Sequence, residues 1–144
     1  MGSFVQNLRI GALLSAGALS CSSAAPSAGP ATFSSDAYTM ATSDSGALRV
    51  EVRTSPQPPA RGTNDAELTL TNADDGQPRD DVDVQVTTWM PAMNHGSSAP
   101  TVTAEGGGKY LVQDVYLYMP GTWELRMTFS GAITDHATAS LPVP

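Results

Sequence analysis

The sequence contains a single cysteine, Cys21, so no disulfide bond can form within the chain. Small domains outside the cytoplasm often depend on disulfides, so stability here has to come from a hydrophobic core. Basic residues are also scarce, at 7 against 14 acidic ones, which gives a net charge of -7. Nucleic-acid binding needs clustered lysine and arginine, so we expect no nucleic-acid partner.

Residues 1–20 resemble a lipoprotein signal peptide. One positive charge, Arg9, precedes an apolar run over residues 10–19 that is too short to span a bilayer. The run ends in "ALSC", which resembles the bacterial lipobox and makes Cys21 the residue to be lipidated. Plain secretion and an uncleaved anchor are the alternatives. We therefore expect an extracytoplasmic protein, lipid-anchored to a bacterial membrane in the periplasm or cell envelope.

A flexible linker is predicted directly after the signal peptide. Residues 22–35, "SSAAPSAGPATFSS", are small, polar and proline-bearing, and cannot bury enough apolar surface to order themselves. With Cys21 they form a lipidated tether, residues 21–35. The remaining residues, 36–144, suffice for one domain with a modest core.

From residue 36 onward, apolar and polar residues alternate with a period of two. In "DVDVQV", for example, Val82, Val84 and Val86 share one face, and the residues between them share the other. This pattern is typical of half-buried antiparallel strands, and no window shows a helical period. We expect an all-β, immunoglobulin-like antiparallel sandwich of about 7–8 strands, with a small barrel as the alternative. The strands are predicted at 36–42, 47–54, 64–72, 81–90, 101–105, 109–118, 122–130 and 133–141.

Soft side chains gather where two of these strands end. Consecutive antiparallel strands alternate in direction, so strands 81–90 and 109–118 point the same way. Met90 and Met119 then lie at one end of the sandwich, and the loop with Met93 and His95 lies there too. Thioether and imidazole ligands suit copper(I). The spacing therefore predicts a copper(I) site made of Met90, Met93, His95 and Met119.

Packing is the competing interpretation of these residues. Methionine fills irregular gaps, Met90 shares the face of Val86, and Met119 is placed to cover Trp123. Zinc fits poorly because only one histidine is near, since His136 is predicted at the opposite end.

Other sites carry less weight. Trp89 falls on the polar face of its strand and is a candidate partner contact. The aspartates in residues 74–81 suggest calcium, but a solvated turn fits their spacing better. No carboxylate in the loop orients His95 and no strand–turn–helix elbow is seen, so we expect no enzyme activity.

The succession "DGQP…DVDV…MPAMNHG…GGGKY…YMPGTWEL" resembles the YtkA-like domain family, which is related in pattern to FixH-like proteins. The resemblance covers roughly residues 45–141. Asn94 departs from the glycine often found between the methionine and the histidine. The matching positions are Gly76, Pro78, Val84, Met90, Pro91, Met93, His95, Gly108, Tyr110, Met119, Pro120, Gly121 and Trp123.

The resemblance implies an immunoglobulin-like sandwich outside the membrane, associated with copper handling, respiratory oxidase assembly or efflux. Two functions follow as expectations. In the first, the tethered domain binds copper(I) and serves a membrane complex. In the second, it is a metal-free adaptor module of a cell-envelope complex.

Overall fold

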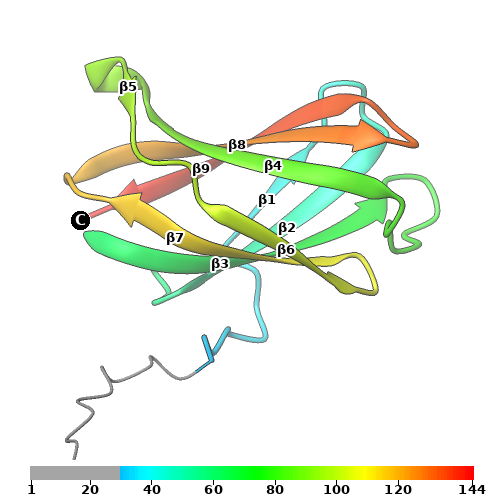
Figure 1. The fold of residues 1–144 in the computed structure, drawn as a ribbon, viewed down its shortest axis with the longest axis horizontal. Helices are drawn as coiled ribbons and strands as arrows, with labels where there is room; N and C mark the ends of the chain where they lie inside the picture. Colours follow the sequence, from blue (N-terminus) through cyan, green and yellow to red (C-terminus); the bar gives the residue numbers. More distant parts are fainter. Residues whose placement is uncertain (1–29) are drawn as a thin grey trace, which may run out of the picture.

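Two antiparallel sheets face each other in the computed structural model, which describes residues 30–144 (Figure 1). The first sheet has the strand order β1-β2-β3-β7-β6 and the second β5-β4-β8-β9. A short 3-10 turn, η1 (Pro91–Met93), follows β4. Residues 30–144 contain no helix long and apolar enough to cross a membrane. The strands are β1 (Thr39–Thr42), β2 (Leu48–Ser55), β3 (Gly62–Asn72), β4 (Val82–Met90), β5 (His95–Gly96), β6 (Thr101–Gly106), β7 (Lys109–Leu117), β8 (Gly121–Gly131) and β9 (Asp135–Val143).

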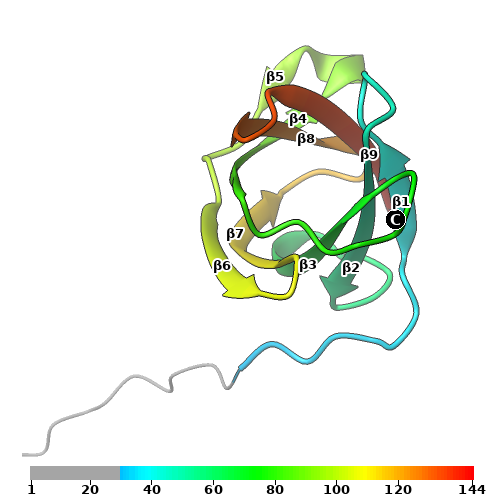
Figure 2. The ribbon, with the colours of Figure 1, turned by 90° about the vertical axis from the view of Figure 1, so that its right-hand side faces the viewer.

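The sandwich prediction is confirmed, and all eight expected strands are present. The view along the strands shows the two layers with space for side chains between them (Figure 2). The barrel alternative is wrong, because no hydrogen-bonded strand pair joins the two sheets within the described chain. One strand was not expected, the two-residue β5. The predicted signal peptide, Cys21 and linker residues 22–29 lie outside the described residues.

The core forms because the period-two pattern holds along the strands. In β8, Trp123, Leu125, Met127 and Phe129 are each at most 1% exposed, and the residues between them face outward. Burying a large apolar side chain contributes roughly 1.5–3 kcal/mol. The sheet-to-sheet core, rather than any covalent link, therefore holds the domain together.

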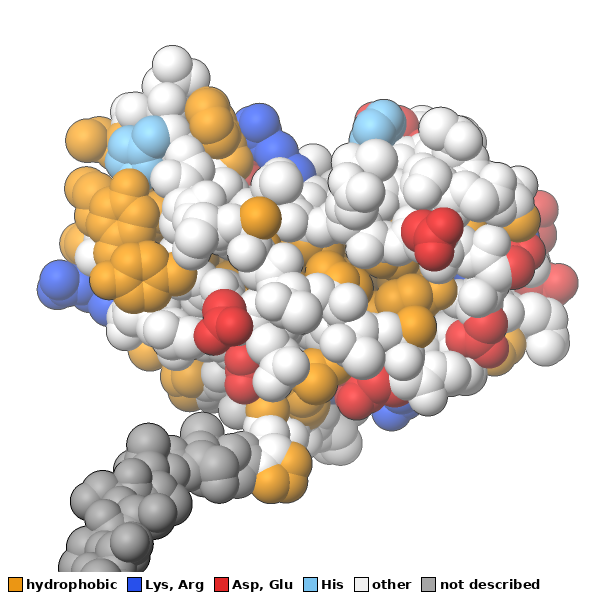
Figure 3. All heavy atoms as spheres, in the orientation of Figure 1, with side chains coloured by type: hydrophobic (Ala, Val, Ile, Leu, Met, Phe, Trp, Pro, Cys, Tyr) orange, Lys and Arg blue, Asp and Glu red, His pale blue; other side chains and the backbone are white. Residues whose placement is uncertain are grey.

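Val84 departs from the expected burial. It shares a strand face with the buried Val82 and Val86, yet it is only half-buried. Along this stretch β4 is the edge of its sheet, because β5 pairs only with Trp89 and Met90. Hydrophobic side chains are visible between β4 and β6 in the space-filling view (Figure 3).

A β-bulge interrupts β7. Ala66 pairs with Val112 and Asn64 pairs with Val115, so Asp65 alone faces two residues of β7. The second of these, Asp114, has a left-handed backbone with φ 62. The extra residue reverses the inward–outward alternation for the rest of the strand. As a result Val115 and Leu117 are buried, and Tyr116 is 44% exposed.

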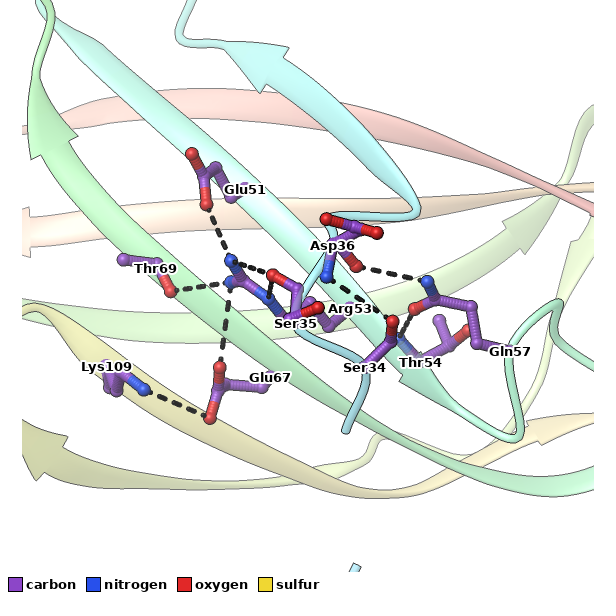
Figure 4. Close-up of polar contacts among 10 residues, drawn as sticks. All are labelled: Ser34, Ser35, Asp36, Glu51, Arg53, Thr54, Gln57, Glu67, Thr69 and Lys109. Carbon is purple, nitrogen blue, oxygen red and sulfur yellow. Dashed lines mark hydrogen bonds and ion pairs between the residues drawn. The ribbon is translucent and has the colours of Figure 1, made fainter. Parts of the chain in front are cut away.

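Residues 30–36 lie across the outer face of the five-stranded sheet. Arg53 donates from Nη2 to the carbonyl of Ser35 at 3.3 Å, and Gln57 donates to the carbonyl of Asp36 at 3.1 Å (Figure 4). Two residues before Ser35, Phe33 is half-buried in a pocket that is also lined by Leu111. The last residues of the predicted tether thus rest on the domain.

Candidate metal centre

The sandwich has two ends that differ in their chemistry. We call one end the methionine pole, defined by Met90, Met93, His95 and Met119. The end of β4, the end of β7 and the start of β8 meet there, as the shared strand direction predicts (Figure 1). The aspartate pole is the opposite end, defined by Asp80, Asp81 and Asp135.

Met90 and His95 are brought together by local structure. They are directly paired residues in the β4–β5 ladder, with η1 between them. Directly paired residues point to the same face of a sheet with Cβ atoms about 5 Å apart. Asn94 closes the turn with a left-handed backbone, φ 52. Asparagine tolerates this conformation, so it can replace the glycine often found there.

An aromatic cluster surrounds His95. Its imidazole stacks on the ring of Tyr118 with centroids 5.5 Å apart, and it meets Trp123 edge-on at 6.0 Å. Tyr118 also stacks on the exposed Tyr116 at 5.7 Å. In Figure 3 a histidine lies beside a gathering of hydrophobic side chains at this end of the molecule.

The loop between β7 and β8 contacts both Trp123 and Met90. The indole Nε1 of Trp123 donates to the carbonyl of Met119 at 3.0 Å. A Cβ built on Gly121 would lie 2.7 Å from Cε of Met90, so the end of the Met90 side chain reaches this loop. Met90, His95 and Met119 therefore belong to one continuous set of contacts.

The four predicted ligands differ in burial. Met90 is 3% exposed, His95 and Met119 are half-buried, and Met93 is 53% exposed. Met90 thus occupies the core position that the packing interpretation expects. Met93 lies in η1, which packs beside β8, and its thioether is open to solvent.

The imidazole of His95 remains able to bind a metal. The Tyr118 hydroxyl lies 2.9 Å from Nδ1 and 3.3 Å from Nε2. Within the ring plane, an oxygen this close to both nitrogens would overlap Cε1, the carbon between them. The Tyr118 hydroxyl therefore lies over the face of the imidazole ring. A metal binds an imidazole nitrogen in that plane. The thioether and imidazole donors are of the types that suit a soft ion such as copper(I). His95 and Met119 are half-buried, Met90 is buried and Met93 is exposed.

The methionine pole offers few of the oxygen and nitrogen ligands that harder ions prefer. Within residues 30–144 no group of three or more His, Cys, Asp and Glu side chains is arranged around a common metal position. His136 is exposed in β9 at the aspartate pole, as expected.

Trp89 is half-buried. The guanidinium of Arg126 lies 4.9 Å from its ring centroid. Gly96 packs closely over the same ring, with an added Cβ 3.4 Å from its Cε3. Part of the indole stays accessible, so its role as a partner contact remains a prediction.

The aspartates near residues 74–81 take part in hydrogen bonds. Asp80 accepts from the backbone N–H of Gly107 at 3.1 Å and of Gly108 at 2.5 Å. Arg79 holds Asp81 in a two-pronged ion pair, with 2.7 Å between Nε and Oδ1. These contacts match the solvated turn expected from the sequence.

Asp135 is the most perturbed acid of the aspartate pole. Hydrogen bonds from the hydroxyls of Ser43 and Ser45 lower the pKa of Asp135 to about 2.

The hydroxyl of Tyr110 lies 2.9 Å from the carbonyl of Val82 and donates to it. Burial, followed by the charge of Asp80, raises the pKa of Tyr110.

Sequence reasoning assigned the tyrosines of the methionine pole to core or end packing and left them out of the candidate site. Tyr118 contacts His95 directly, and Tyr116 extends the stack to the surface. Strict alternation from Tyr110 puts both tyrosines inside the core. Because of the bulge at Asp114, Tyr116 instead faces outward and Tyr118 is half-buried against the end of the core. Only the repeated aromatic residues in "VYLYMP" pointed to this cluster.

The fold and this pole define a small antiparallel β-sandwich that displays soft and aromatic side chains at one end. The chain belongs to the YtkA-like family, whose model matches residues 42–128. This confirms the family resemblance. No curated protein and no solved structure matches the chain.

Proposed function

We propose that this YtkA-like domain is held on the extracytoplasmic side of a membrane by a lipid on Cys21 and binds copper(I) at the methionine pole. Met90, His95 and Met119 form the inner ligands, and Met93 closes the site from outside. The domain stores the ion or passes it to a membrane complex for oxidase assembly or efflux. It has no enzyme activity of its own.

The observation that carries this proposal is the pairing of Met90 with His95, next to the loop of Met119. Two segments that are distant in sequence, residues 90–95 and the loop of Met119, have soft donors at one end of the domain. Copper(I) can be bound by two to four such donors, and it does not require a charged ligand. An exposed thioether at Met93 supplies a first contact for an ion arriving from solution or from a carrier.

Competition with a coloured copper(I) chelator tests the proposal. We expect wild-type protein to remove copper(I) from the chelator at submicromolar affinity. Met93→Ala changes an exposed side chain, so its loss of affinity cannot be attributed to unfolding. We expect each of Met93→Ala and His95→Ala to weaken binding about ten-fold or more, since each removes one ligand.

Two matched variants serve as controls. Met40 in β1 is 61% exposed, comparable to Met93, and lies in the other sheet. His136 is an exposed histidine at the aspartate pole. Met40→Ala and His136→Ala should bind like wild type. Failure of wild type to compete, or equal losses in the controls, would refute the copper site.

The adaptor function is favoured by a separate observation. Met93 and Tyr116 are the large hydrophobic residues exposed at the methionine pole, at 53% and 44%. Aromatic residues and methionine are enriched at protein interfaces. A metal-free adaptor uses this surface directly, and it predicts no copper(I) binding together with loss of complex formation in Tyr116→Ser.

A further inference from the structure

The two sheets have four edge strands, and three of them are protected against further pairing. Exposed edges invite pairing with other chains, and proteins usually blunt them. β1 has only four residues, and β6 has a register shift between Ala104 and Gly106. β9 carries Pro142, and its edge is covered where the backbone N–H of Asp44 donates to the carbonyl of His136 at 2.8 Å.

The fourth edge, along β4, has no such protection. Its pairing with β8 runs from Val82 to Trp89 without a register shift, and the strand contains no proline or lysine. On the other side, β5 pairs only with Trp89 and Met90. In the described part of the chain no strand pairs with this side of β4 between Val82 and Thr87.

The direction of the backbone groups along this edge follows from neighbouring contacts. Ala132 donates to the carbonyl of Asp81 at 3.2 Å, so Asp81 faces β8. In an antiparallel pair, alternate residues face the partner strand. The N–H and C=O groups of Val84 and Val86 therefore point away from β8. Val82 fits this pattern, because its carbonyl accepts from Tyr110 on the open side.

Beside this edge the surface is hollowed. The hollow extends between β4 and β6. The apolar side chains of Val84, Val86, Val102 and Ala104 line it, together with the polar residues Gln85 and Thr87. Figure 3 shows hydrophobic side chains at this place. A strand added to β4 would place every second side chain over this hollow and the others outside.

The outer side of the edge is acidic. Asp83 is exposed on β4, and Asp80 and Asp81 are exposed directly before the strand. Arg79 pairs with Asp81, which leaves Asp83 without an ion pair among the described residues. A second copy of this chain would bring a further charge of -7 to the same place. The charge therefore favours a basic partner over self-association.

We propose that the β4 edge receives an extended segment of a partner protein in which apolar and basic residues alternate. The segment pairs with the backbone of Val84 and Val86. Its apolar side chains fill the hollow, and its basic side chains lie beside Asp83. This surface lies between the two poles, so the proposal does not depend on the copper site.

Amide hydrogen exchange followed by NMR on the full-length protein is the direct test. In the free protein the amides of Val84 and Val86 should exchange rapidly, while those of Asp83 and Gln85 are protected by β8. The probe is a synthetic heptapeptide of alternating lysine and valine. Its addition should slow exchange at Val84 and Val86.

Variants separate backbone pairing from charge. Val84→Pro removes an edge N–H without touching the residues that bond to β8, and we expect about ten-fold weaker peptide binding. Asp83→Lys leaves the backbone intact. It should weaken the lysine peptide about five-fold and strengthen a glutamate–valine counterpart. Asp44→Lys makes the same charge change at another edge and should leave both affinities unchanged.

Several results would overturn the proposal. Protection of Val84 and Val86 in the dilute free protein would mean that the edge is already covered. Equal binding of the lysine and glutamate peptides would refute the proposal that the partner segment is basic. Protection that grows with protein concentration alone would assign the edge to a second copy. Should Val84→Pro fail to fold, the Asp83→Lys comparison and the exchange pattern still decide.

Discussion

The two poles of this sandwich are built on different physical principles. At the aspartate pole, loops are joined by hydrogen bonds to backbone groups, such as Asp80 to Gly108 and Tyr110 to Val82. At the methionine pole, contacts between rings and thioethers dominate, and Met93 and Tyr116 stay exposed. Directional bonds specify one geometry, whereas soft contacts tolerate rearrangement. We infer that the aspartate pole stabilises the fold and the methionine pole carries the function.

We expect the largest loss of free energy of unfolding for a substitution of a glycine at the aspartate pole. Gly108 has φ +76, and a methyl group there would overlap the carbonyl of Leu70. Gly108→Ala should lower the free energy of unfolding by roughly 4 kcal/mol, measured by urea denaturation. Gly107 has φ +65 with open space around it, so Gly107→Ala should cost only about 1–2 kcal/mol. Equal costs would contradict the packing argument.

A matched pair of tyrosines compares the poles directly. Tyr110→Phe leaves the buried carbonyl of Val82 without its donor and should cost about 1–2 kcal/mol in urea denaturation. Tyr118→Phe removes a hydroxyl at a half-buried site, and we expect about 0.5 kcal/mol or less. A larger loss for Tyr118→Phe would mean that the methionine pole is the more rigid end.

Acid should weaken the aspartate pole through Asp135. The pKa of Asp135 is lowered to about 2 in the folded state, against an ordinary value of 3.8. Its stabilising contribution is therefore complete above about pH 4 and is lost as the pH falls towards 2. Asp135→Asn should flatten the fall in melting temperature over this window. An unchanged acid limb would show that other carboxylates control it.

The smallest effect on stability is expected at Met93. Its side chain is 53% exposed, so Met93→Ala should change the free energy of unfolding by no more than about 0.5 kcal/mol. Met40→Ala gives the matching value in the other sheet. Met90→Ala, at a buried site, should instead cost about 2–5 kcal/mol. A large loss for Met93→Ala would make it a packing residue.

Much of the candidate site was accessible from strand direction alone. The common direction of the predicted strands 81–90 and 109–118 indicated that Met90 and Met119 share one end. In the structure, the β4–β5 ladder places His95 beside Met90. Burial was less accessible. Met90 and Met93 are three positions apart, yet one is buried and the other exposed, because η1 turns the chain out of the sheet.

The amino-acid pattern by itself determined the antiparallel sandwich and the end at which the soft side chains gather, because alternation and chain direction are local properties. The tertiary structure decided which residues surround His95 and which edge stays open. The bulge at Asp114 reverses the alternation of β7, and the shortness of β5 leaves Val84 and Val86 unpaired on one side. The bulge depends on pairing between the distant strands β3 and β7, and the open edge depends on no other strand of the described chain covering β4. The sequence of a single strand encodes neither.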